Sequence, residues 1–429
     1  MRTAHIITIG HELLIGDTVN TNASWIGQQL TDLGLEVVQI QTVGDDEQRL
    51  RDAIERGRSD ADLLITTGGL GPTHDDITKK VVAELTGARM VVHEPTLKFI
   101  KKVFEKRNIP FTESNYQQAE VLDKAEVLFN KQGTAPGMWL HEDGVYIGIL
   151  PGVPQEMKHL MREKILSKIG DLTEGRSQRF SRYLLTAGIG ESTLSDRVIG
   201  SLGDYLDGEV AVAYLPSPQG VRIRVSAFGR DKSRVGKKLD AVCEHIYTQA
   251  GKYIVGEGKE LTLSGGLGRL LRERHLSIAA AESCTGGLLM DTLTDIPGSS
   301  DYIAGGVVAY ANRIKTNLLG VDEKDLATFG AVSKTVALQM AEAAGRRLEA
   351  DIGVSTTGIA GPGGGTPEKP VGTVWIGYWS GERHFAIRAL LTNDRLINKE
   401  RSVAIALETV RRTLLDIEPM PYGLEVHPS

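Results

Sequence analysis

The sequence predicts an α/β protein in which two doubly wound α/β domains are joined by a small α+β module. Three observations support this prediction. Short β-rich runs alternate with helical patterns at both ends of the chain, glycine-bearing loops follow several of these runs, and the middle of the chain has a different order of elements. Alternating strands and helices are typical of parallel sheets covered on both faces, which bind ligands at the carboxyl ends of their strands.

The chain is long enough for several domains. Its 429 residues exceed one ordinary core, and the polar, glycine-bearing segments at 170–178 and 256–259 are typical of linkers. We therefore expect domains at 1–169, 170–257 and 258–417, followed by a loosely held tail at 418–429.

Composition narrows the class of protein. The formal net charge of −6 argues against a nucleic-acid partner, since proteins that bind nucleic acids usually present a basic surface. The two cysteines, Cys243 and Cys284, are far apart and indicate neither a metal site nor a disulfide framework. No apolar run is long enough for a signal peptide core or a membrane span. We expect a cytoplasmic protein with no membrane partner.

Alternation of strands and helices defines the first domain. The hydrophobic pattern predicts strands at 4–9, 36–42, 61–67 and 145–150, and helices at 21–34, 46–58, 95–108 and 155–168.

Polar residues follow the strands of this domain. The loop 68–76 (GGLGPTHDD) joins a strand to a helix, and its glycines allow close approach of a phosphate. Asp75 and Asp76 suit either a helix cap or a divalent cation beside an anionic ligand, and we favour the cation. Asp45 follows the neighbouring strand at the same rim and could join them. The loop matches neither the dinucleotide GxGxxG nor a P-loop, which argues against NAD-dependent redox chemistry and motor ATPases.

The middle module combines strands and helices without alternation. Strands are predicted at 182–189, 209–215, 221–229 and 253–255, and helices at 191–202 and 232–250. No acid, base and nucleophile cluster here, so we expect a connecting or dimerising module.

The third domain alternates again. Its predicted helices are 261–274, one starting at 283, 333–348 and one starting near 394; its predicted strands are 275–281, 307–310, 352–358, 373–379 and 384–390.

The run 279–287 (AAAESCTGG) is the most informative feature of the third domain. Ser283 and Cys284 lie where an apolar strand pattern ends and an apolar helix begins. Unpaired N–H groups at a helix start suit an anionic ligand or a developing oxyanion. Ser283 is equally compatible with a structural role as a helix N-cap.

A nucleophilic serine needs a base. Lys315, in the run 307–315 (VVAYANRIK), is the candidate, because a lysine buried near a glycine-lined site can lose its proton. The residues alone nevertheless favour a solvated helix position for Lys315. The glycine-rich loop 356–365 (TTGIAGPGGG) is expected to wrap a ligand, and Arg395 could bind a phosphate or form a surface salt bridge.

With these motifs assembled, nearly the whole chain resembles the bacterial CinA family, the competence/damage-inducible protein A. ITTGGLGPTHDD, GTAPG and LPGVP resemble the molybdopterin-binding fold, in the branch associated with metal-dependent ADP-ribose pyrophosphatase activity. AESCTGG, VVAYANRIK, TTGIAGPGGG and KPVGTVWIGY resemble the nicotinamide-nucleotide amidases.

For the third domain, the resemblance implies deamidation of nicotinamide mononucleotide to nicotinate mononucleotide and ammonia, without a cofactor. Ser283 would be the nucleophile and Lys315 the base. The substrate contacts implied are Cys284, Thr285, Gly286, Tyr310, Thr357, Gly358, Gly361 and Arg395.

For the first domain, the resemblance implies hydrolysis of ADP-ribose to AMP and ribose 5-phosphate. The substrate contacts implied are Glu12, Gly68, Gly69, Gly71 and Thr73. Asp45, Asp75 and Asp76 would hold a divalent metal (Co²⁺, Mg²⁺ or Mn²⁺), and K⁺ is a further candidate ion.

The resemblance also implies a homodimer whose partners are small nucleotides. Both substrates arise from the breakdown of NAD, so one chain could serve its recycling. Two alternatives stay open: a first domain that binds a molybdopterin-type ligand, and a nucleotide-sensing, competence-related binding protein.

Overall fold

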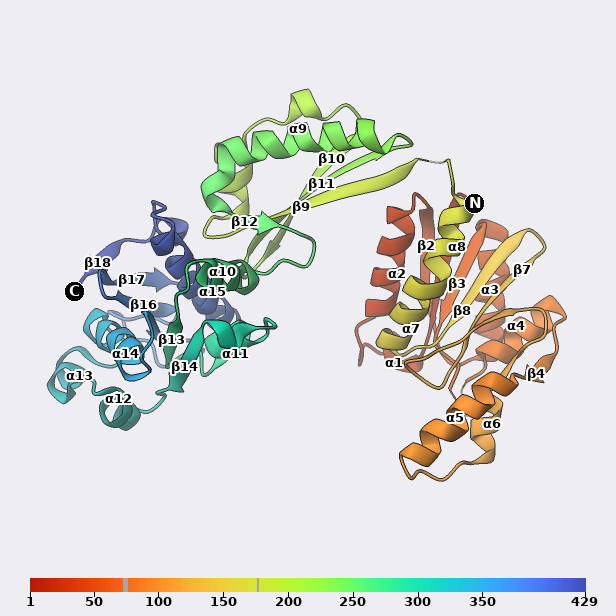
Figure 1. Ribbon diagram of the computed structural model, residues 1–429, viewed down its shortest axis with the longest axis horizontal. Helices are drawn as coiled ribbons and strands as arrows, with labels where there is room; N and C mark the ends of the chain where they lie inside the picture. Colours follow the sequence, from red (N-terminus) through yellow and green to blue (C-terminus); the bar gives the residue numbers. More distant parts are fainter. Residues whose placement is uncertain (72–75, 176) are drawn as a thin grey trace. The chain divides into compact units, whose positions relative to one another are not determined.

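The computed structural model describes residues 1–71, 76–175 and 177–429, and the chain forms two compact units (Figure 1). The first unit comprises Met1–Phe180 with Phe228–Val235, and the second comprises Ser181–Ala227 with Gly236–Ser429. In the described part of the chain, no helix combines the length and the apolar character needed to cross a membrane.

The first unit is built on a six-stranded sheet. In spatial order its strands are β2 (Glu36–Val43), β1 (Thr3–Ile9), β3 (Leu63–Thr67), β8 (Val145–Leu150), β7 (Gly137–Glu142) and β6 (Glu126–Leu128). The first four are parallel, whereas β7 and β6 are antiparallel to their neighbours. A separate two-stranded ribbon pairs β4 (Met90–Val92) with β5 (Glu120–Leu122).

Helices cover both faces of this sheet. They are α1 (His11–Leu14), α2 (Thr21–Asp32), α3 (Glu47–Asp60), α4 (Thr78–Thr86), α5 (Glu94–Lys106), α6 (Glu113–Gln118), α7 (Pro154–Leu160) and α8 (Leu166–Leu172). The apolar side chains of α2, α7 and α8 pack against Ile6 and Ile65, and those of α3 and α4 pack against Ile7 and Leu64. Because successive strand side chains point to opposite faces, β1 and β3 bury apolar residues on both faces.

The middle module is a four-stranded sheet with one long helix. The strand order is β10 (Val210–Ser217), β11 (Gly220–Gly229), β9 (Gln178–Thr186) and β12 (Ile254–Glu257). Helix α9 (Lys232–Ala250) runs alongside these strands (Figure 1). A π-helix, Thr193–Ile199, occupies part of the helix predicted at 191–202.

The carboxy-terminal sheet is mixed. Its order is β14 (Ile303–Val308), β13 (Ile278–Glu282), β15 (Ile352–Gly358), β16 (Thr373–Ser380), β17 (His384–Leu390) and β18 (Val426–Pro428). The first three strands are parallel, and each later pair is antiparallel.

Helices also cover both faces of this second large sheet. They are α10 (Leu263–Glu273), α11 (Leu288–Thr294), α12 (Asn312–Leu319), α13 (Glu323–Phe329), α14 (Lys334–Arg347) and α15 (Arg395–Leu414). Helices α10, α11 and α15 share a core with Ile278 and Ala280, whereas α12 and α14 share one with Ala279 and Ala281. The predicted α/β class, with two doubly wound domains and a smaller module, is therefore confirmed.

Two expectations about the third domain are wrong. The helix expected to start at Ser283 starts at Leu288, because Gly286 and Gly287 turn the chain through left-handed conformations (φ +62° and +99°). The tail is not loosely held: Met420 is 4% exposed in the core, and β18 pairs with the edge of β17.

Candidate active site

Ser283 lies directly after β13, a strand with parallel neighbours on both sides. Its backbone N–H donates to the carbonyl of Thr356 at 2.9 Å, which continues the pairing with β15 by one residue. Its side chain is 9% exposed, at the carboxyl edge of the parallel strands. Ligands of open α/β sheets bind at this edge, so the fold places a hydroxyl where a substrate can reach it.

The turn after Ser283 is held by Glu282. This carboxylate is fully buried and accepts hydrogen bonds from the N–H groups of Gly287 (2.9 Å), Leu289 (3.1 Å) and Met290 (2.9 Å). The negative charge therefore caps the first turn of α11, where a helix presents unpaired donors and its positive end. The interpretation of Ser283 as the N-cap is wrong, since Glu282 fills that role and leaves the serine hydroxyl for other contacts. This role of Glu282 was not predicted from the sequence, although the residue stands within the AESCTGG run.

Lys315 is buried beside Ser283. Its Nζ lies 2.9 Å from Ser283 Oγ, 2.7 Å from the carbonyl of Ala309 and 3.2 Å from that of Tyr310, and the residue is 1% exposed. The solvated position that the residues alone favoured is therefore wrong. In the described part of the chain, no carboxylate forms an ion pair with this amine. Burial consequently lowers the pKa of Lys315 below its ordinary value.

Lys315 Nζ donates to three oxygens, Ser283 Oγ and the carbonyl oxygens of Ala309 and Tyr310, which are as many acceptors as an ammonium group can use. A neutral amine has two hydrogens and one lone pair. The carbonyls of Ala309 and Tyr310 can accept the two hydrogens, which directs the lone pair at Ser283 Oγ. In the structure Nζ donates to Ser283 Oγ; once the amine has lost a proton, the serine hydroxyl can donate to Nζ instead, as a nucleophile does to its general base.

The neighbouring Cys284 and Thr285 face inward. Cys284 belongs to the apolar core of this domain, and burial raises the pKa of its thiol to about 12. A thiol with such a pKa carries almost no nucleophilic thiolate at neutral pH. The hydroxyl of Thr285 pairs with that of Thr356 at 2.6 Å in the interior. Cys284 still borders the cavity described next, whereas Thr285 and Gly286 support the turn.

A cavity of about 180 Å³ opens over the Ser283–Lys315 pair. The predicted residues that line it are Ser283, Cys284, Tyr310, Lys315, Thr357, Gly358 and Arg395. Four further lining residues were not predicted from the sequence: Asn312, Ala331, Val332 and Ala360. Asn312 opens the helix that carries Lys315, and Ala360 lies in the glycine-rich loop, so the motifs already identified could have pointed to both residues. No motif in the sequence pointed to Ala331 or Val332.

Arg395 and the glycine-rich loop form one wall of this cavity. Arg395 donates to the carbonyl of Gly361 at 2.9 Å and to the hydroxyl of Tyr310 at 3.1 Å. Thr357 donates to the carbonyl of Ala331 at 2.7 Å. At Gly358 a Cβ would lie 2.7 Å from a Val374 methyl carbon, so only glycine fits there.

In the first unit, the predicted glycines stand where side chains do not fit. A Cβ at Gly68 (φ +109°) would lie 2.2 Å from the carbonyl oxygen of Ile9, and one at Gly69 (φ +64°) 2.3 Å from Thr78 Oγ1. At Gly71 a Cβ would lie 2.6 Å from a carboxylate oxygen of Asp76, so the two residues are neighbours. The predicted Thr73 and Asp75 lie outside the described residues.

Glu12 lies in the first turn of the short helix α1, and Asp45 contacts the start of that helix. Glu12 lines a cavity of about 110 Å³ together with Thr8, Asn20, Asn22 and Thr67. Asp45 accepts a hydrogen bond from the N–H of His11 at 3.1 Å. Outside residues 72–75 and 176, no three His, Cys, Asp or Glu side chains gather closely enough to hold a metal. Because Asp75 is not described, the set of Asp45, Asp75 and Asp76 stays a prediction.

Three family models match consecutive parts of the chain. Residues 5–170 match a probable molybdopterin binding domain, residues 181–256 match the damage-inducible protein CinA KH domain, and residues 260–414 match the CinA C-terminal domain. The domain limits expected from the linkers stay predictions.

Relatives match almost end to end. A CinA-like protein of Salinibacter ruber is 45% identical over 413 residues, which cover 96% of this chain and 99% of the relative. A putative competence-damage inducible protein of Halothermothrix orenii is 42% identical over 375 residues, covering 87% and 89% of the two chains. A crystal structure of the protein CinA, with unknown function, from Thermoplasma acidophilum is 36% identical and covers 39% of this chain and 98% of its own, with a TM-score of 0.37.

The three hydrogen bonds of Glu282 predict a structural cost for its replacement. In Glu282→Gln one acceptor oxygen becomes an NH₂ group that faces backbone donors. We expect the free energy of unfolding of the second unit to fall by about 1–3 kcal/mol, the usual penalty of an unsatisfied buried group. Urea denaturation measures this change. Glu273→Gln, at the exposed end of α10, is the matched control, and an equal effect of both variants would contradict the capping role.

Proposed function

The chain belongs to the CinA family, and from that premise we propose that its carboxy-terminal domain is a serine amidohydrolase that converts nicotinamide mononucleotide to nicotinate mononucleotide and ammonia. One observation carries the proposal: a buried amine lies 2.9 Å from the hydroxyl of Ser283, in a cavity that a small substrate can enter. The Lys315 amine has the position and the lowered pKa that a general base requires.

Acylation is the first half of the proposed reaction. Ser283 Oγ attacks the carboxamide carbon, and its proton passes to Lys315 Nζ. The resulting ammonium then gives a proton to the amide nitrogen, so the C–N bond breaks and ammonia leaves. N–H groups near Cys284 and Thr285 are the proposed donors to the oxyanion, because they belong to the turn that carries the nucleophile.

Deacylation completes the cycle with the same two residues. A water molecule gives its proton to Lys315 Nζ and attacks the acyl carbon. The ester bond to Ser283 breaks, nicotinate mononucleotide leaves, and the serine recovers its proton from Lys315. No cofactor is needed for either half.

The cavity wall suits a pyridinium nucleotide. Tyr310 is 61% exposed at the cavity, so its ring can stack on a cationic pyridinium. The guanidinium of Arg395, in contact with the Tyr310 hydroxyl, offers donors to a phosphate. These contacts support the substrate proposed.

For the amino-terminal unit, our proposal is metal-dependent hydrolysis of ADP-ribose to AMP and ribose 5-phosphate. The supporting observation is the polar cavity beside Glu12, where the buried Oδ1 of Asn22 has no hydrogen-bond partner in the described part of the chain. A ligand hydroxyl or amine would satisfy it. Carboxylates such as Asp45 and Asp76 are the ligands that Mg²⁺ and Mn²⁺ prefer, so they fit a divalent cation that would polarise a pyrophosphate. A molybdopterin-type ligand is the alternative.

The homodimer, the restriction to small-nucleotide partners, K⁺ as an accessory ion and the cytoplasmic location remain proposals that follow from the resemblance.

Ammonia release from nicotinamide mononucleotide tests the amidase. We expect Ser283→Ala and Lys315→Ala each to lose at least about 10³-fold in kcat, because the two residues act as one unit. Cys284→Ala is the matched control, since its inward-facing thiol takes no part, and it should keep its activity within about tenfold of the parent protein. Full activity of Ser283→Ala would show that Ser283 is not the nucleophile. An inactive parent protein would favour the alternative of a nucleotide-sensing protein.

The lowered pKa of Lys315 predicts a pH dependence. The base acts only when neutral, so kcat/KM should fall as the pH drops through the pKa of Lys315 and should level off above it. Because burial lowers this pKa, the pH at which kcat/KM begins to fall should be lower than the ordinary pKa range of lysine. The measurement is a pH–rate profile of the whole chain at subsaturating substrate. A rate independent of pH wherever the fold stays intact would contradict Lys315 as the base.

Asp45→Asn tests the proposed metal site. We expect AMP release from ADP-ribose with Mn²⁺ to fall by at least about tenfold, a loss that even outer-sphere changes cause at metal sites. Glu55→Gln, on the exposed side of α3, is the control. Equal AMP release from both variants would remove Asp45 from the metal set, and tighter binding of a pterin than of ADP-ribose would favour the alternative ligand.

A further inference from the structure

The second unit contains a cavity of about 390 Å³ that is separate from the serine site. One wall comes from the middle module, through the loop after β9 and the β10–β11 hairpin, and the other comes from the end of β17, from α15 and from the tail. Val221, Leu391, Ile405 and Leu424 give it an apolar surface. Its volume is within the range of small-molecule sites.

Two opposite charges border this apolar surface. Arg401, on α15, and Glu191, in the loop after β9, both line the cavity. Within residues 1–71, 76–175 and 177–429, neither side chain forms an ion pair or a hydrogen bond. Arg401 lies close enough to Tyr422 to influence its hydroxyl electrostatically. The cavity therefore offers one cation and one anion, and a ligand with both charges would complement them.

Tyr422, which lines the cavity, has a strained backbone conformation. Its φ of +56° is in the left-handed region, which non-glycine residues rarely adopt. Its N–H donates to the carbonyl of Gly188 at 2.7 Å, which ties the tail to the middle module. Strained residues of this kind persist where their surroundings fix them, and they are frequent at ligand sites.

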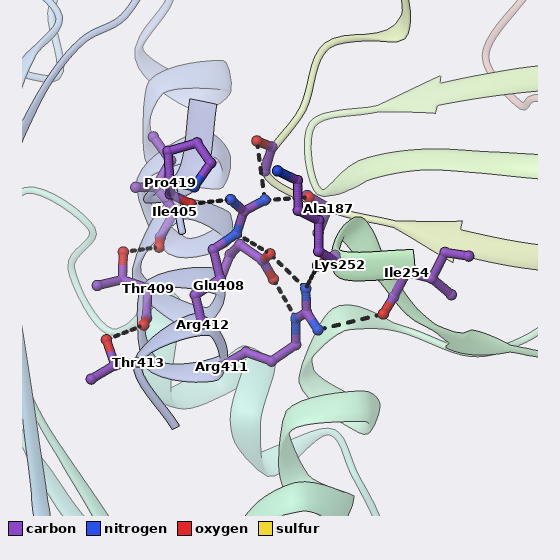
Figure 2. Close-up of polar contacts among 11 residues, drawn as sticks. Ala187, Lys252, Ile254, Ile405, Glu408, Thr409, Arg411, Arg412, Thr413 and Pro419 are labelled. Atoms are coloured by element: carbon purple, nitrogen blue, oxygen red, sulfur yellow. Dashed lines mark hydrogen bonds and ion pairs between the residues drawn. The ribbon is translucent and has the colours of Figure 1, made fainter. Parts of the chain in front are cut away.

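A buried ion cluster joins the two walls of the cavity (Figure 2). Glu408 accepts from Arg411 Nε and from Arg412 Nε, both at 2.7 Å. The guanidinium groups also donate to middle-module carbonyls, Arg411 to Lys252 and Arg412 to Ala187, both at 3.1 Å. All three charged residues are at most 4% exposed. These hydrogen bonds connect the two walls of the cavity, so the cavity belongs to the folded structure of this unit.

Helix α15 and the segment before it connect this cavity to the serine site. Leu391 in the cavity precedes Thr392, whose N–H donates to Asn398 Oδ1 at 2.9 Å. Asn398 Nδ2 donates in turn to the carbonyl of Ala360, which lines the serine cavity, at 2.9 Å. Arg395 opens this helix and Arg401 follows Asn398 on it. An occupant that moves Leu391 or Arg401 would therefore act on Arg395 and on the glycine-rich loop.

We propose that this cavity binds a small zwitterion with an apolar body, of the class of apolar α-amino acids, and that binding there alters the affinity of the serine site for its substrate. The carboxylate pairs with Arg401, the ammonium with Glu191, and the side chain covers Leu391 and Ile405. A dianionic phosphate fits less well, because the cavity has a single guanidinium opposite a carboxylate. The binding step stands independently; its effect on substrate affinity rests on the proposed amidase function.

Isothermal titration calorimetry of the whole chain with L-phenylalanine tests the binding step. We expect saturable binding that Arg401→Gln and Glu191→Gln each weaken at least about tenfold. Three analogues that each lack one feature should bind at least about tenfold more weakly: 3-phenylpropanoate, phenethylamine and glycine. Glu400→Gln, the exposed neighbour on α15, should leave binding unchanged, and circular dichroism verifies that each variant is folded.

Several outcomes would overturn the proposal. They are an absence of binding to the parent protein, binding that neither charge variant weakens, and equal weakening by Glu400→Gln. The effect on the serine site is measured as the KM for nicotinamide mononucleotide with and without L-phenylalanine. An unchanged KM in an active protein overturns the coupling. If the parent protein releases no ammonia, the amidase proposal fails, and calorimetry still decides the binding step.

Discussion

The carboxylate of Glu282 holds the turn on which the serine site depends. It is the last residue of a strand enclosed by parallel neighbours, and it accepts three N–H groups at the start of the next helix. Without a buried anion at this point, those donors would need solvent or the serine hydroxyl as partners. Because the carboxylate satisfies them, the side chain of Ser283 is left to meet Lys315. The surroundings of Ser283 are thus set partly by Glu282, which does not line the cavity itself.

The strength of the local pattern decided how much of the fold the sequence predicted. The strands 145–150, 352–358 and 384–390 and the helix 232–250 were predicted with the bounds that the structure has. Turn-forming residues lie close to the ends of these runs, among them Gly144, Asp351, Gly381 and Gly251. The edge strand β18 was overlooked, because three residues carry no periodicity and their partner, β17, is distant in the sequence.

The candidate site divides in the same way. Motif residues such as Thr357 and Arg395 were named from the sequence, and the structure brings them to one cavity with Ser283. The burial of Lys315 could not be predicted from its neighbours, because it depends on carbonyls that only the folded loop after β14 presents. Charged side chains prefer solvent on average, and Lys315 departs from that average because the fold supplies other acceptors for its amine.

Helix α15 shows how far a domain limit can be from a physical boundary. Arg411 and Arg412 together carry one more positive charge than Glu408 neutralises, and the middle module supplies backbone carbonyls to both. In the last domain alone, these two guanidinium groups would lose the carbonyls of the middle module and would contact water instead. The sequence divides this part of the chain into two segments, the middle module and the carboxy-terminal domain. The compact unit around α15 includes residues of both and is therefore larger than either segment.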